Sequence, residues 1–369
     1  FYLSAEGSST PGKWRTLPYQ REIMDAMTDP TVDRITWMKS KRVGYTKVLT
    51  ALNGYHIAQD PCSILHIQPT VEDAEGYSKD EIDPLIRDVD AVTEVFGDLK
   101  SRDKRNTILK KTFPGGSMYL VGANSGRGFR RISVRLVEFD EVDAYPPSAG
   151  KEGDVLSLGE GRAEDAWNSK ILIGSTPLIK GTSIVSRSFD ESDQRRFWVP
   201  CPHCDHGQIL KWGGRDTDYG LKWPKGEPER AAYLCEQCHC MIEHAQKFAM
   251  LDQGEWVAAA PFKGHAGFHI WAAYSYLPKA SWGKLAEQWE RVDRNPGRLQ
   301  VFVNTVLGEP WEEVGEAPSE ERLMQRREAY PTRVVASSAP DEEPRIEIVV
   351  PRRAVVLTSM TDVQNNRLE

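Results

Sequence analysis

The segments WMKSKRVGYTK at residues 37–47 and LVEFDE at residues 136–141 carry the strongest signals of fold in this chain. The first has the spacing of a phosphate-binding loop that turns at Gly44, and the second is an apolar run that ends in Asp140 and Glu141, 96 residues after that glycine. A buried strand with this ending can deliver one carboxylate to Mg²⁺ and a second to the water that attacks a phosphate. Together the two segments predict nucleotide hydrolysis.

The loop departs from the consensus G-x-x-x-x-G-K-[ST] at two positions. Lys39 stands where the first glycine is expected, and Tyr45 stands where the lysine is expected. Gly44 and Thr46 keep their places. Gly44 would let backbone amides turn towards phosphate oxygens, and Thr46 would offer a hydroxyl to Mg²⁺. The helix expected after them would direct its positive end to the same point.

The loop therefore needs a substitute for its missing lysine. Phosphate groups are not held out of water without a cation, and four cations lie near the turn: Lys39, Lys41, Arg42 and Lys47. The spacing does not select one of them. By itself the loop could be a basic surface turn, and the acidic strand downstream is what favours a nucleotide site.

Length and composition are those of an ordinary globular protein. The chain has 369 residues, 40% hydrophobic and 27% charged, which predicts about two domains. No apolar stretch reaches the roughly 20 residues that cross a bilayer, and the first residues carry no basic or apolar targeting region, so we expect a cytoplasmic protein without membrane contact. Because the chain begins at Phe1 rather than methionine, we expect a fragment of a longer protein.

The charge is distributed unevenly. A net charge of −7 argues against a nucleic-acid partner, yet ten Lys or Arg residues and one acid, Asp103, lie between Lys100 and Arg135. A local excess of this kind can follow a phosphate backbone. The alternative is a solvated basic face, and the position of the stretch just before the acidic strand favours contact with a polyanion.

Short apolar runs alternate with helical patterns over the first half of the chain. Strands are expected near 35–38, 63–70, 117–123, 132–141 and 170–177, with a capped helix that starts at Thr70. This alternation predicts an α/β fold with a mostly parallel sheet flanked by helices, of the ASCE type of P-loop ATPase, with a zinc-ribbon-like insertion. The expected parts are an ATPase core at 1–195, the insertion at 196–245, the C-terminal part of the ATPase domain at 246–311, a linker at 312–350 and the first strand of a truncated domain at 351–369.

Four cysteines have the spacing of a structural metal site. They form two C-x-x-C knuckles, CPHC at 201–204 and CEQC at 235–238. In an intracellular chain, Cys201, Cys204, Cys235 and Cys238 are expected to bind Zn²⁺ through four thiolates rather than to form disulfides. The alternative is a pair of reduced knuckles without metal. Cys240, His203, His206 and His239 are possible substitute ligands.

Several segments, taken in order, resemble those of a known family. These are LPYQ at 17–20, KSKRVGYTK at 39–47, ILHIQPT at 64–70, FDEVDAYP at 139–146, GSTPLIKGTS at 174–183, CPHC at 201–204 and FVNTVLGEPWE at 302–312. Their order over nearly the whole chain is similar to that of the large terminase subunit of tailed bacteriophages, in the lambda-like branch. The resemblance implies an ATPase motor that drives double-stranded DNA into an empty capsid.

The resemblance also implies roles for individual residues. Tyr19 and Gln20 would hold adenine, Arg42 would lie near the γ-phosphate, and Lys39 would be the displaced phosphate lysine. Asp140 would organise Mg²⁺ with Thr46, Glu141 would be the general base, and Ser175 and Thr176 would couple phosphate occupancy to the parts that grip DNA. The residues expected to contact ATP are Tyr19, Gln20, Lys39, Ser40, Lys41, Arg42, Val43, Gly44, Tyr45, Thr46, Lys47 and Asp140.

Partners and a second activity follow from the same resemblance. The partners would be double-stranded DNA, the small terminase subunit, the portal protein of the procapsid and further copies of this chain in a ring, within the host bacterial cytoplasm. An arginine from a neighbouring copy would complete the site, and its candidates are Arg127, Arg130, Arg131 and Arg135. Family members also carry an RNase H-like nuclease, whose first metal-binding aspartate matches Asp362; because the sequence stops at Glu369, we expect DNA cleavage only from the full-length parent.

Two alternatives remain open from the sequence. A non-catalytic DNA-binding scaffold built around the zinc ribbon would explain Tyr45 in the lysine position, but it has no use for the acidic pair Asp140-Glu141. A helicase-like remodeller would share the ATPase core and would need strand-separating elements that the sequence does not reveal.

Overall fold

The computed structural model describes residues 1–4, 11–97, 106–213, 217–292 and 295–312, and the strands at 332–335, 345–348, 363–364 and 367–368. The chain divides into two compact units, Phe1–Glu313 and Val314–Glu369. In the second unit β16 (Thr332–Val335) pairs with β17 (Arg345–Ile348), and β18 (Val363–Gln364) pairs with β19 (Arg367–Leu368). Most of the expected linker and the predicted nuclease ligand Asp362 lie outside the described residues.

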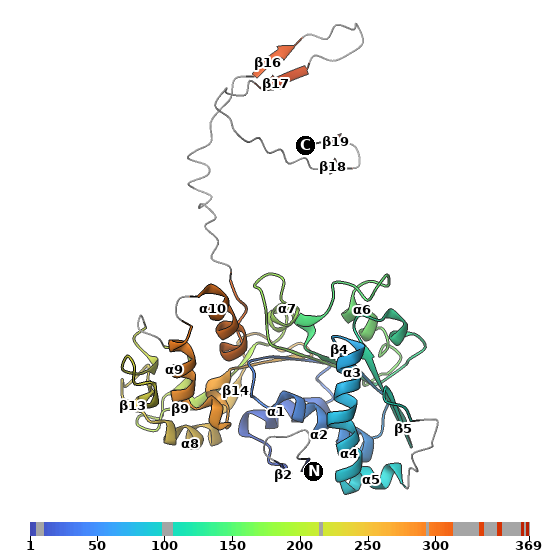
Figure 1. The fold of residues 1–369 in the computed structure, drawn as a ribbon, viewed down its shortest axis with the longest axis horizontal. Helices are drawn as coiled ribbons and strands as arrows, with labels where there is room; N and C mark the ends of the chain where they lie inside the picture. Colours follow the sequence, from blue (N-terminus) through green and yellow to red (C-terminus); the bar gives the residue numbers. More distant parts are fainter. Residues whose placement is uncertain are drawn as a thin grey trace. The chain divides into compact units, whose positions relative to one another are not determined.

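A ten-stranded sheet forms the centre of the first unit (Figure 1). Its strands are β3 (Arg34–Lys39), β4 (Ile64–Gln68), β5 (Lys110–Phe113), β6 (Gly116–Gly122), β7 (Leu136–Asp140), β8 (Lys170–Ser175), β9 (Arg195–Pro200), β10 (Gly207–Ile209), β14 (Glu255–Val257) and β15 (His265–Ile270). They are ordered β10-β9-β15-β3-β8-β7-β4-β6-β5, and β14 pairs with β9 off this path. Neighbours from β9 to β6 are parallel, whereas β5, β10 and β14 are antiparallel. The predicted α/β class is confirmed, with a mixed sheet.

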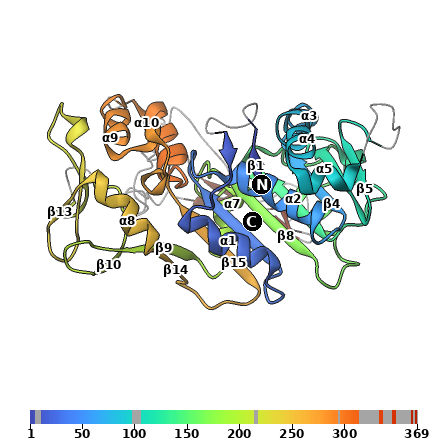
Figure 2. The same cartoon turned by 90° about the horizontal axis from the view of Figure 1, so that it is seen from below.

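Helices cover both faces of this sheet (Figures 1 and 2). The helices are α1 (Pro18–Thr28), α2 (Tyr45–Ala58), α3 (Val71–Tyr77), α4 (Asp83–Asp88), α5 (Asp90–Phe96), α6 (Val155–Glu160), α7 (Ile184–Asp190), α8 (Lys247–Asp252), α9 (Trp282–Glu290) and α10 (Pro296–Phe302). Helices α1 to α5 lie on one face of the sheet, and α6 and α7 lie on the other. Side chains alternate between the faces along each strand, so Ile64 joins the core under α2 while Leu65 joins the core under α7.

Several local predictions are confirmed by the helices and turns. The side chain of Thr70 caps α3 by accepting from the amide of Asp73 at 3.1 Å. A turn at 113–116 joins β5 to β6, with Gly115 at a φ of 89°. A positive φ is a conformation that glycine adopts without steric cost.

The sequence did not predict the place of β15. This strand follows residues 201–242, which contain the four cysteines and which we call the cysteine region. It nevertheless lies beside β3 at the middle of the sheet. The segment after it returns to the end of β3, where Ile270 and Thr305 accept hydrogen bonds from the amides of Ser40 and Lys41. The phosphate-loop strand is therefore an inner strand that later parts of the chain enclose.

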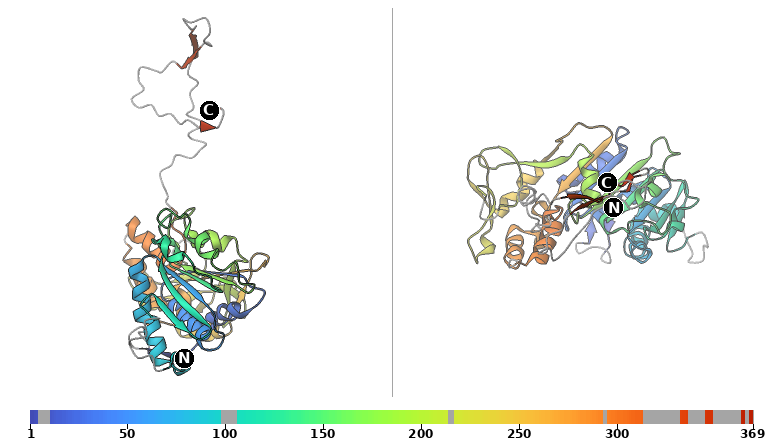
Figure 3. Two further views of the ribbon diagram at one scale, coloured as in Figure 1. Left: turned by 90° about the vertical axis from the view of Figure 1, so that its right-hand side faces the viewer. Right: turned by 90° about the horizontal axis from the view of Figure 1, so that it is seen from above.

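The cysteine region lies at one end of the first unit, opposite α3 to α5 (Figures 2 and 3). It contains a three-stranded sheet of β11 (Gly220–Lys222), β12 (Ala232–Leu234) and β13 (Met241–Ile242). At the N-terminal end of the unit β1 (Tyr2–Leu3) pairs with β2 (Gly12–Lys13). Within the part of the chain that the structure describes, no helix has the length and apolar character needed to span a bilayer.

Candidate active site at the ends of three parallel strands

The predicted loop and the predicted acids meet at one edge of the sheet. Met38 of β3 is in register with Ser175 of β8, and Asp140 of β7 is in register with Gly174 of the same strand. Because parallel strands end at a common edge, Lys39, Asp140 and Ser175 lie side by side there. The turn around Gly44 and the carboxylates of residues 140 and 141 thus belong to one site.

The loop ends in an open helix terminus. Gly44 has a φ of 82° and is the N-cap of the 14-residue helix α2. The amides of Ser40 and Lys41 are already bonded, but none of those from Arg42 to Lys47 meets a carbonyl or side-chain acceptor of the described chain. Unsatisfied amides at a helix N-terminus bind anions, because the helix dipole adds to their attraction.

Gln20 and a later segment of the chain hold the loop in this shape. The amide nitrogen of Gln20 donates to Val43 O at 3.1 Å, and a Cβ at Gly44 would lie 2.5 Å from it. Ser275 Oγ donates to Arg42 O at 2.5 Å, and the guanidinium of Arg42 donates to Lys279 O at 3.0 Å. Arg42 itself has a φ of 69°, a strained conformation for a residue with a Cβ.

The structure separates the four candidate cations. Lys39 is buried, and its Nζ lies 2.7 Å from Glu141 Oε1, between the loop and the acidic strand. Lys47 is directed away from this point, because its Nζ binds Glu81 at 2.5 Å. Lys41 and Arg42 are exposed at the outer side of the loop. Only Lys39 of the four lies in contact with the predicted catalytic acids.

Tyr45, which occupies the consensus lysine position, points into the core. Its ring contacts Trp37 at 5.2 Å, and its hydroxyl donates to Phe139 O at 3.4 Å. A Cβ at Gly174 would lie 2.1 Å from that hydroxyl, so the tyrosine depends on the neighbouring glycine. Lys39 Nζ lies 4.7 Å from the centre of the tyrosine ring, within cation–π range. Tyr45 thus supports Lys39.

Asp140 has the features of a metal-binding carboxylate. Its Oδ2 accepts from Gln68 Nε2 at 2.8 Å, and its Oδ1 has no partner among the described residues although it is buried. Burial raises the pKa of Asp140, although the ammonium of Lys39 opposes this shift. A buried oxygen without a partner is costly. A divalent cation at Oδ1 would satisfy it, and Mg²⁺ prefers oxygen ligands.

Glu141 is held from two sides. Besides Lys39, its carboxylate accepts from Ser175 Oγ at 3.3 Å and from the amide of Thr176 at 3.4 Å. Burial favours a raised pKa for Glu141, but the charge and hydrogen bond of Lys39 outweigh burial, so the pKa is lowered. The side chain is still 42% exposed, and its backbone has a φ of 53°. Glu141 is therefore an ionised group that water can reach.

The structure gives Tyr19 and Gln20 different surroundings from those implied by an adenine site. Tyr19 is 0% exposed, and its ring contacts Phe197 and Tyr276. Stacking on adenine would require α1 to move. Gln20 is also buried, with its amide oxygen accepting from Leu17 N and its amide nitrogen bound to the loop.

Sequence reasoning missed Gln68 and His66 on β4. His66 accepts from the same amide group of Gln68 that binds Asp140. A signal was present in the sequence, because both residues interrupt the apolar run ILHIQ at a spacing of two. Glu138 and Asp140 have the same spacing in LVEFD, and residues with this spacing share one face of a strand.

The four predicted cysteines form a cluster with the dimensions of a zinc site. A tetrahedral site with Zn–S distances of about 2.3 Å separates its sulfurs by about 3.8 Å. Cys201 and Cys238 Sγ are 3.8 Å apart, Cys204 and Cys235 Sγ are 3.9 Å apart, and all four sulfurs lie within 4.8 Å of one another. Cys240 and the three nearby histidines do not belong to this cluster. The donor set fits Zn²⁺.

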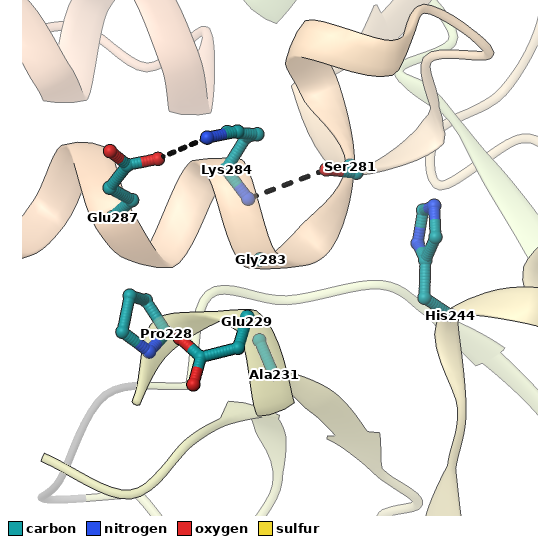
Figure 4. Close-up of a pocket in the computed structure, with 8 residues that line it drawn as sticks. All are labelled: Pro228, Glu229, Ala231, His244, Ser281, Gly283, Lys284 and Glu287. Carbon is teal, nitrogen blue, oxygen red and sulfur yellow. Dashed lines mark hydrogen bonds and ion pairs between the residues drawn. The ribbon is translucent and has the colours of Figure 1, made fainter. Parts of the chain in front are cut away.

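A separate pocket of about 460 Å³ lies between the cysteine region and α9 (Figure 4). Its lining residues are Pro228, Glu229, Ala231, His244, Ser281, Gly283, Lys284 and Glu287. Lys284 and Glu287 bind each other at 2.7 Å across its edge. The pocket contains none of the predicted nucleotide or metal residues.

Two family models match this chain. Residues 8–256 match the family of the phage terminase large subunit gpA, ATPase domain, and residues 265–369 match the terminase large subunit gpA, endonuclease domain. The second match begins at β15, a strand of the central sheet.

Individual relatives carry the same description. The chain is 36% identical to the terminase large subunit of Enterobacteria phage P21 over 393 residues and 33% identical to that of Escherichia phage lambda over 389 residues. Both alignments cover 100% of this chain and 58% of the relative, so the chain spans less than two thirds of their length. The large terminase ATPase domain of Thermus phage P74-26 is similar with a TM-score of 0.44 and 15% identity, over 78% of this chain and 92% of that one. The chain belongs to the phage terminase large subunit gpA family.

Proposed function

We propose that this chain is the ATP-hydrolysing motor part of a DNA-packaging terminase, with the ASCE arrangement of a P-loop ATPase. The observation that carries the proposal is the contact between Lys39 and Glu141 at 2.7 Å, beneath a loop whose next amides are unsatisfied. This contact supports a site in which a phosphate-binding cation, a base and an anion-binding helix end would act together.

Phosphate binding would fall to Lys39 and to the loop amides from Arg42 to Thr46. A triphosphate competes with Glu141 for the ammonium of Lys39, because both are anions within reach of the same Nζ. When Lys39 turns to phosphate, Glu141 loses its strongest partner and keeps the weaker contacts with Ser175 and Thr176. Its carboxylate is then available to accept a proton from water, which is the task of a general base.

Mg²⁺ would be held by Asp140 and by the hydroxyl of Thr46, the second residue of α2. The free Oδ1 of Asp140 and the partial exposure of Thr46 support these assignments. When bound, Mg²⁺ supplies charge neutralisation at the β- and γ-phosphates. Arg42 remains the proposed partner of the γ-phosphate, since its guanidinium is exposed beside the loop.

Ser175 and Thr176 are proposed to report on the state of Glu141. Ser175 Oγ is within 3.3 Å of both Glu141 Oε2 and the amide of Asp143, so it links the base to the turn that follows β7. A change in the position of Glu141 would therefore alter hydrogen bonds that reach the backbone at Asp143 and at Thr176. This linkage supports their proposed coupling role.

Two of the four arginines proposed to act on a neighbouring copy remain as candidates. Arg135 binds Asp60, and Arg130 binds Glu152. Arg127 and Arg131 are exposed around the short helix η2 (Gly126–Phe129), and neither forms an ion pair with a described residue. Arg127 and Arg131 are therefore better placed than Arg130 and Arg135 to reach a neighbouring copy.

Zn²⁺ is proposed as a structural ion of the cysteine region, since four thiolates leave no open position for a reactant. Proposed partners are double-stranded DNA, the small terminase subunit, the portal protein and further copies in a ring, in the host bacterial cytoplasm. DNA cleavage is proposed for the full-length parent.

The test is the substitution Glu141→Gln, which keeps the shape of the side chain and removes the base. We expect ATP hydrolysis to fall by about 10²–10⁴-fold, the usual contribution of a general base, while a fluorescent ATP analogue still binds. Asp140→Asn is the companion variant, for which the Mg²⁺ requirement changes. Turnover by Glu141→Gln at the parent rate would refute the assignment.

A further inference from the structure

A continuous hydrogen-bonded chain of buried polar side chains runs behind the proposed metal ligand. It consists of Asp140, Gln68, His66, Glu138 and Asn53, and we refer to it as the Asp140–Asn53 chain. Its members on β4 and β7 alternate with apolar residues, so they share the face of the sheet that α2 and α3 cover. All five are less than 8% exposed.

The contacts follow one another without a gap. Gln68 Nε2 lies 2.8 Å from Asp140 Oδ2 and 2.8 Å from His66 Nε2. His66 Nδ1 lies 2.7 Å from Glu138 Oε2, and Asn53 Nδ2 lies 3.1 Å from the same oxygen. The chain therefore extends from the metal-ligand position on β7 to the middle of α2, the helix whose N-terminus forms the phosphate loop.

With the Gln68 amide oriented as in the structure and Asp140 ionised, the hydrogen bonds of this network take one set of directions. The amide nitrogen of Gln68 has two hydrogens, and it donates one to Asp140 and the other to His66. His66 Nε2 must then be an acceptor, so the ring proton lies on Nδ1 and is donated to Glu138. This tautomer is assigned from its neighbours.

The ring of His66 is fixed from another side as well. It stacks on Tyr77 of α3 with ring centres 4.0 Å apart and an angle of 11° between the planes. The hydroxyl of Tyr77 accepts from Asn53 Nδ2 at 3.2 Å. The middle of the chain is therefore held by α2 and α3 together.

Stability alone does not account for this network. Buried polar groups are often replaced by apolar ones without loss of stability, and Glu138 Oε1 and Asn53 Oδ1 remain without partners among the described residues. The effect of the Asp140–Asn53 chain is on the geometry of the Asp140 carboxylate. This chain occupies Oδ2 of Asp140 and leaves the buried Oδ1 without a partner among the described residues.

We propose that Gln68 and His66, supported by Glu138 and Asn53, are positioning residues that set the orientation of the Asp140 carboxylate relative to the phosphate loop. This inference rests on the proposed role of Asp140 as the Mg²⁺ ligand. Partners behind a ligating group orient it, and removing one typically costs 10–100-fold in metal affinity or activity. The chain would also couple α2 to β7, so that a shift of the loop helix is transmitted to the metal ligand.

The experiment measures, for two variants of the whole chain, the Mg²⁺ dependence of ATP hydrolysis and, without turnover, the Mg²⁺ dependence of binding of a non-hydrolysable fluorescent ATP analogue. Gln68→Met keeps the length of the side chain and removes both donors, and His66→Phe keeps the stacked ring and removes both nitrogens. For each variant we expect the Mg²⁺ concentration at half-maximal rate to rise by about tenfold, while the KM for ATP at saturating Mg²⁺ changes by less than about twofold. The matched control is Gln208→Met, since Gln208 is another fully buried glutamine of the same sheet, on β10.

Three outcomes are distinguishable. If Asp140→Asn raises the Mg²⁺ requirement but both chain variants keep the parent value, the positioning role is refuted and the proposed function stands. If Asp140→Asn leaves the Mg²⁺ requirement unchanged, the proposed function fails first. Should Gln68→Met not fold by circular dichroism, Gln68→Asn withdraws the same donors by one methylene group, and an unchanged Mg²⁺ requirement there refutes the inference equally.

Discussion

The candidate active site lies at the ends of β3, β7 and β8, which we call the nucleotide edge of the sheet. This edge and the cysteine cluster bring their reactive groups together in opposite ways. The edge brings together Lys39, Asp140, Glu141 and Ser175 from three neighbouring strands, and each is oriented by further partners. The cluster takes two cysteines from each of two short knuckles, and a bound ion would hold them. The first site depends on the whole sheet, whereas the second depends on its ligands.

This difference predicts how each site responds to damage. A metal cluster is cooperative, since one missing ligand releases an ion whose binding stabilises the surrounding fold. A site distributed over a sheet loses function stepwise, because the remaining strands keep the other groups in place. The predictions below test that contrast.

The largest expected effect is the loss of zinc from Cys201→Ser. Structural zinc binding contributes about 10–16 kcal/mol in small metal domains, so we expect the bound zinc to fall from one ion per chain to none. Metal analysis gives the stoichiometry, and limited proteolysis detects opening of residues 201–240. Cys240→Ser is the matched control, as Cys240 is exposed beside the knuckles and outside the cluster. Zinc retained by Cys201→Ser would contradict the four-thiolate site.

The next effect is that of Lys39→Met on hydrolysis. Removing one preorganised charge from a site of this kind costs about 10²–10³-fold in turnover, and we expect the fold to persist because the methionine fills the same buried space. Lys47→Met serves as the comparison, since Lys47 binds Glu81 instead of Glu141. Steady-state ATP hydrolysis decides between them. An equal loss of ATP turnover in both variants would show that Lys39 contributes no more to hydrolysis than Lys47 does.

A smaller effect is expected from Gly44→Ala in the loop. The φ of 82° disfavours alanine, and the new Cβ would meet the amide of Gln20 at 2.5 Å. Strain of this kind costs about 1–3 kcal/mol, and we expect the thermal unfolding temperature and the affinity for an ATP analogue to fall together. Adding Gln20→Ala relieves the contact but not the strain, so recovery is expected to be partial. Full recovery in the double variant would contradict the role of backbone conformation.

The smallest effect concerns pH and Lys247, a buried residue whose Nζ donates to Ser275 O at 2.5 Å. Burial lowers the pKa of Lys247 from 10.5 to about 7. Between these pH values the unfolded chain binds a proton that the folded chain has lost, so this residue makes the free energy of unfolding rise with pH by at most about 1.4 kcal/mol per unit. Below pH 7 the contribution is constant.

Denaturant unfolding of the parent and of Lys247→Met, measured from pH 7 to pH 9, checks this window. We expect the slope with pH to be smaller in the variant. Equal slopes would mean that Lys247 is protonated in the folded chain throughout this range. Lys247 is connected to the loop through Ser275, because the hydroxyl of Ser275 donates to Arg42 O.

Much of the site was predictable because its signals are local. An apolar run that ends in Asp140-Glu141 is typical of a buried strand with its acids at the end, and a glycine with a hydroxyl residue two positions later is typical of a helix N-terminus. The knuckles specify their own geometry through their spacing. The capped start of α3 at Thr70 follows from a single side chain and an amide three residues away.

Other features could not be predicted, because they depend on contacts between distant segments. Nothing near Lys39 in the chain distinguishes it from Lys41 or Lys47; Glu81 and Glu141 make the distinction. The burial of Tyr19 depends on Phe197 and Tyr276, which no local pattern connects to it.

Local sequence accounts for the class of fold, the acidic pair, the helix-capping turn and the four thiolates, because each arises from residues within one turn or one strand. Contacts between distant segments select the lysine that meets the acids, place β15 beside β3 and bring Gln68 and His66 behind Asp140. Register between parallel strands and packing of helices across the sheet bring these groups together, and both depend on the summed burial of many side chains rather than on any one segment.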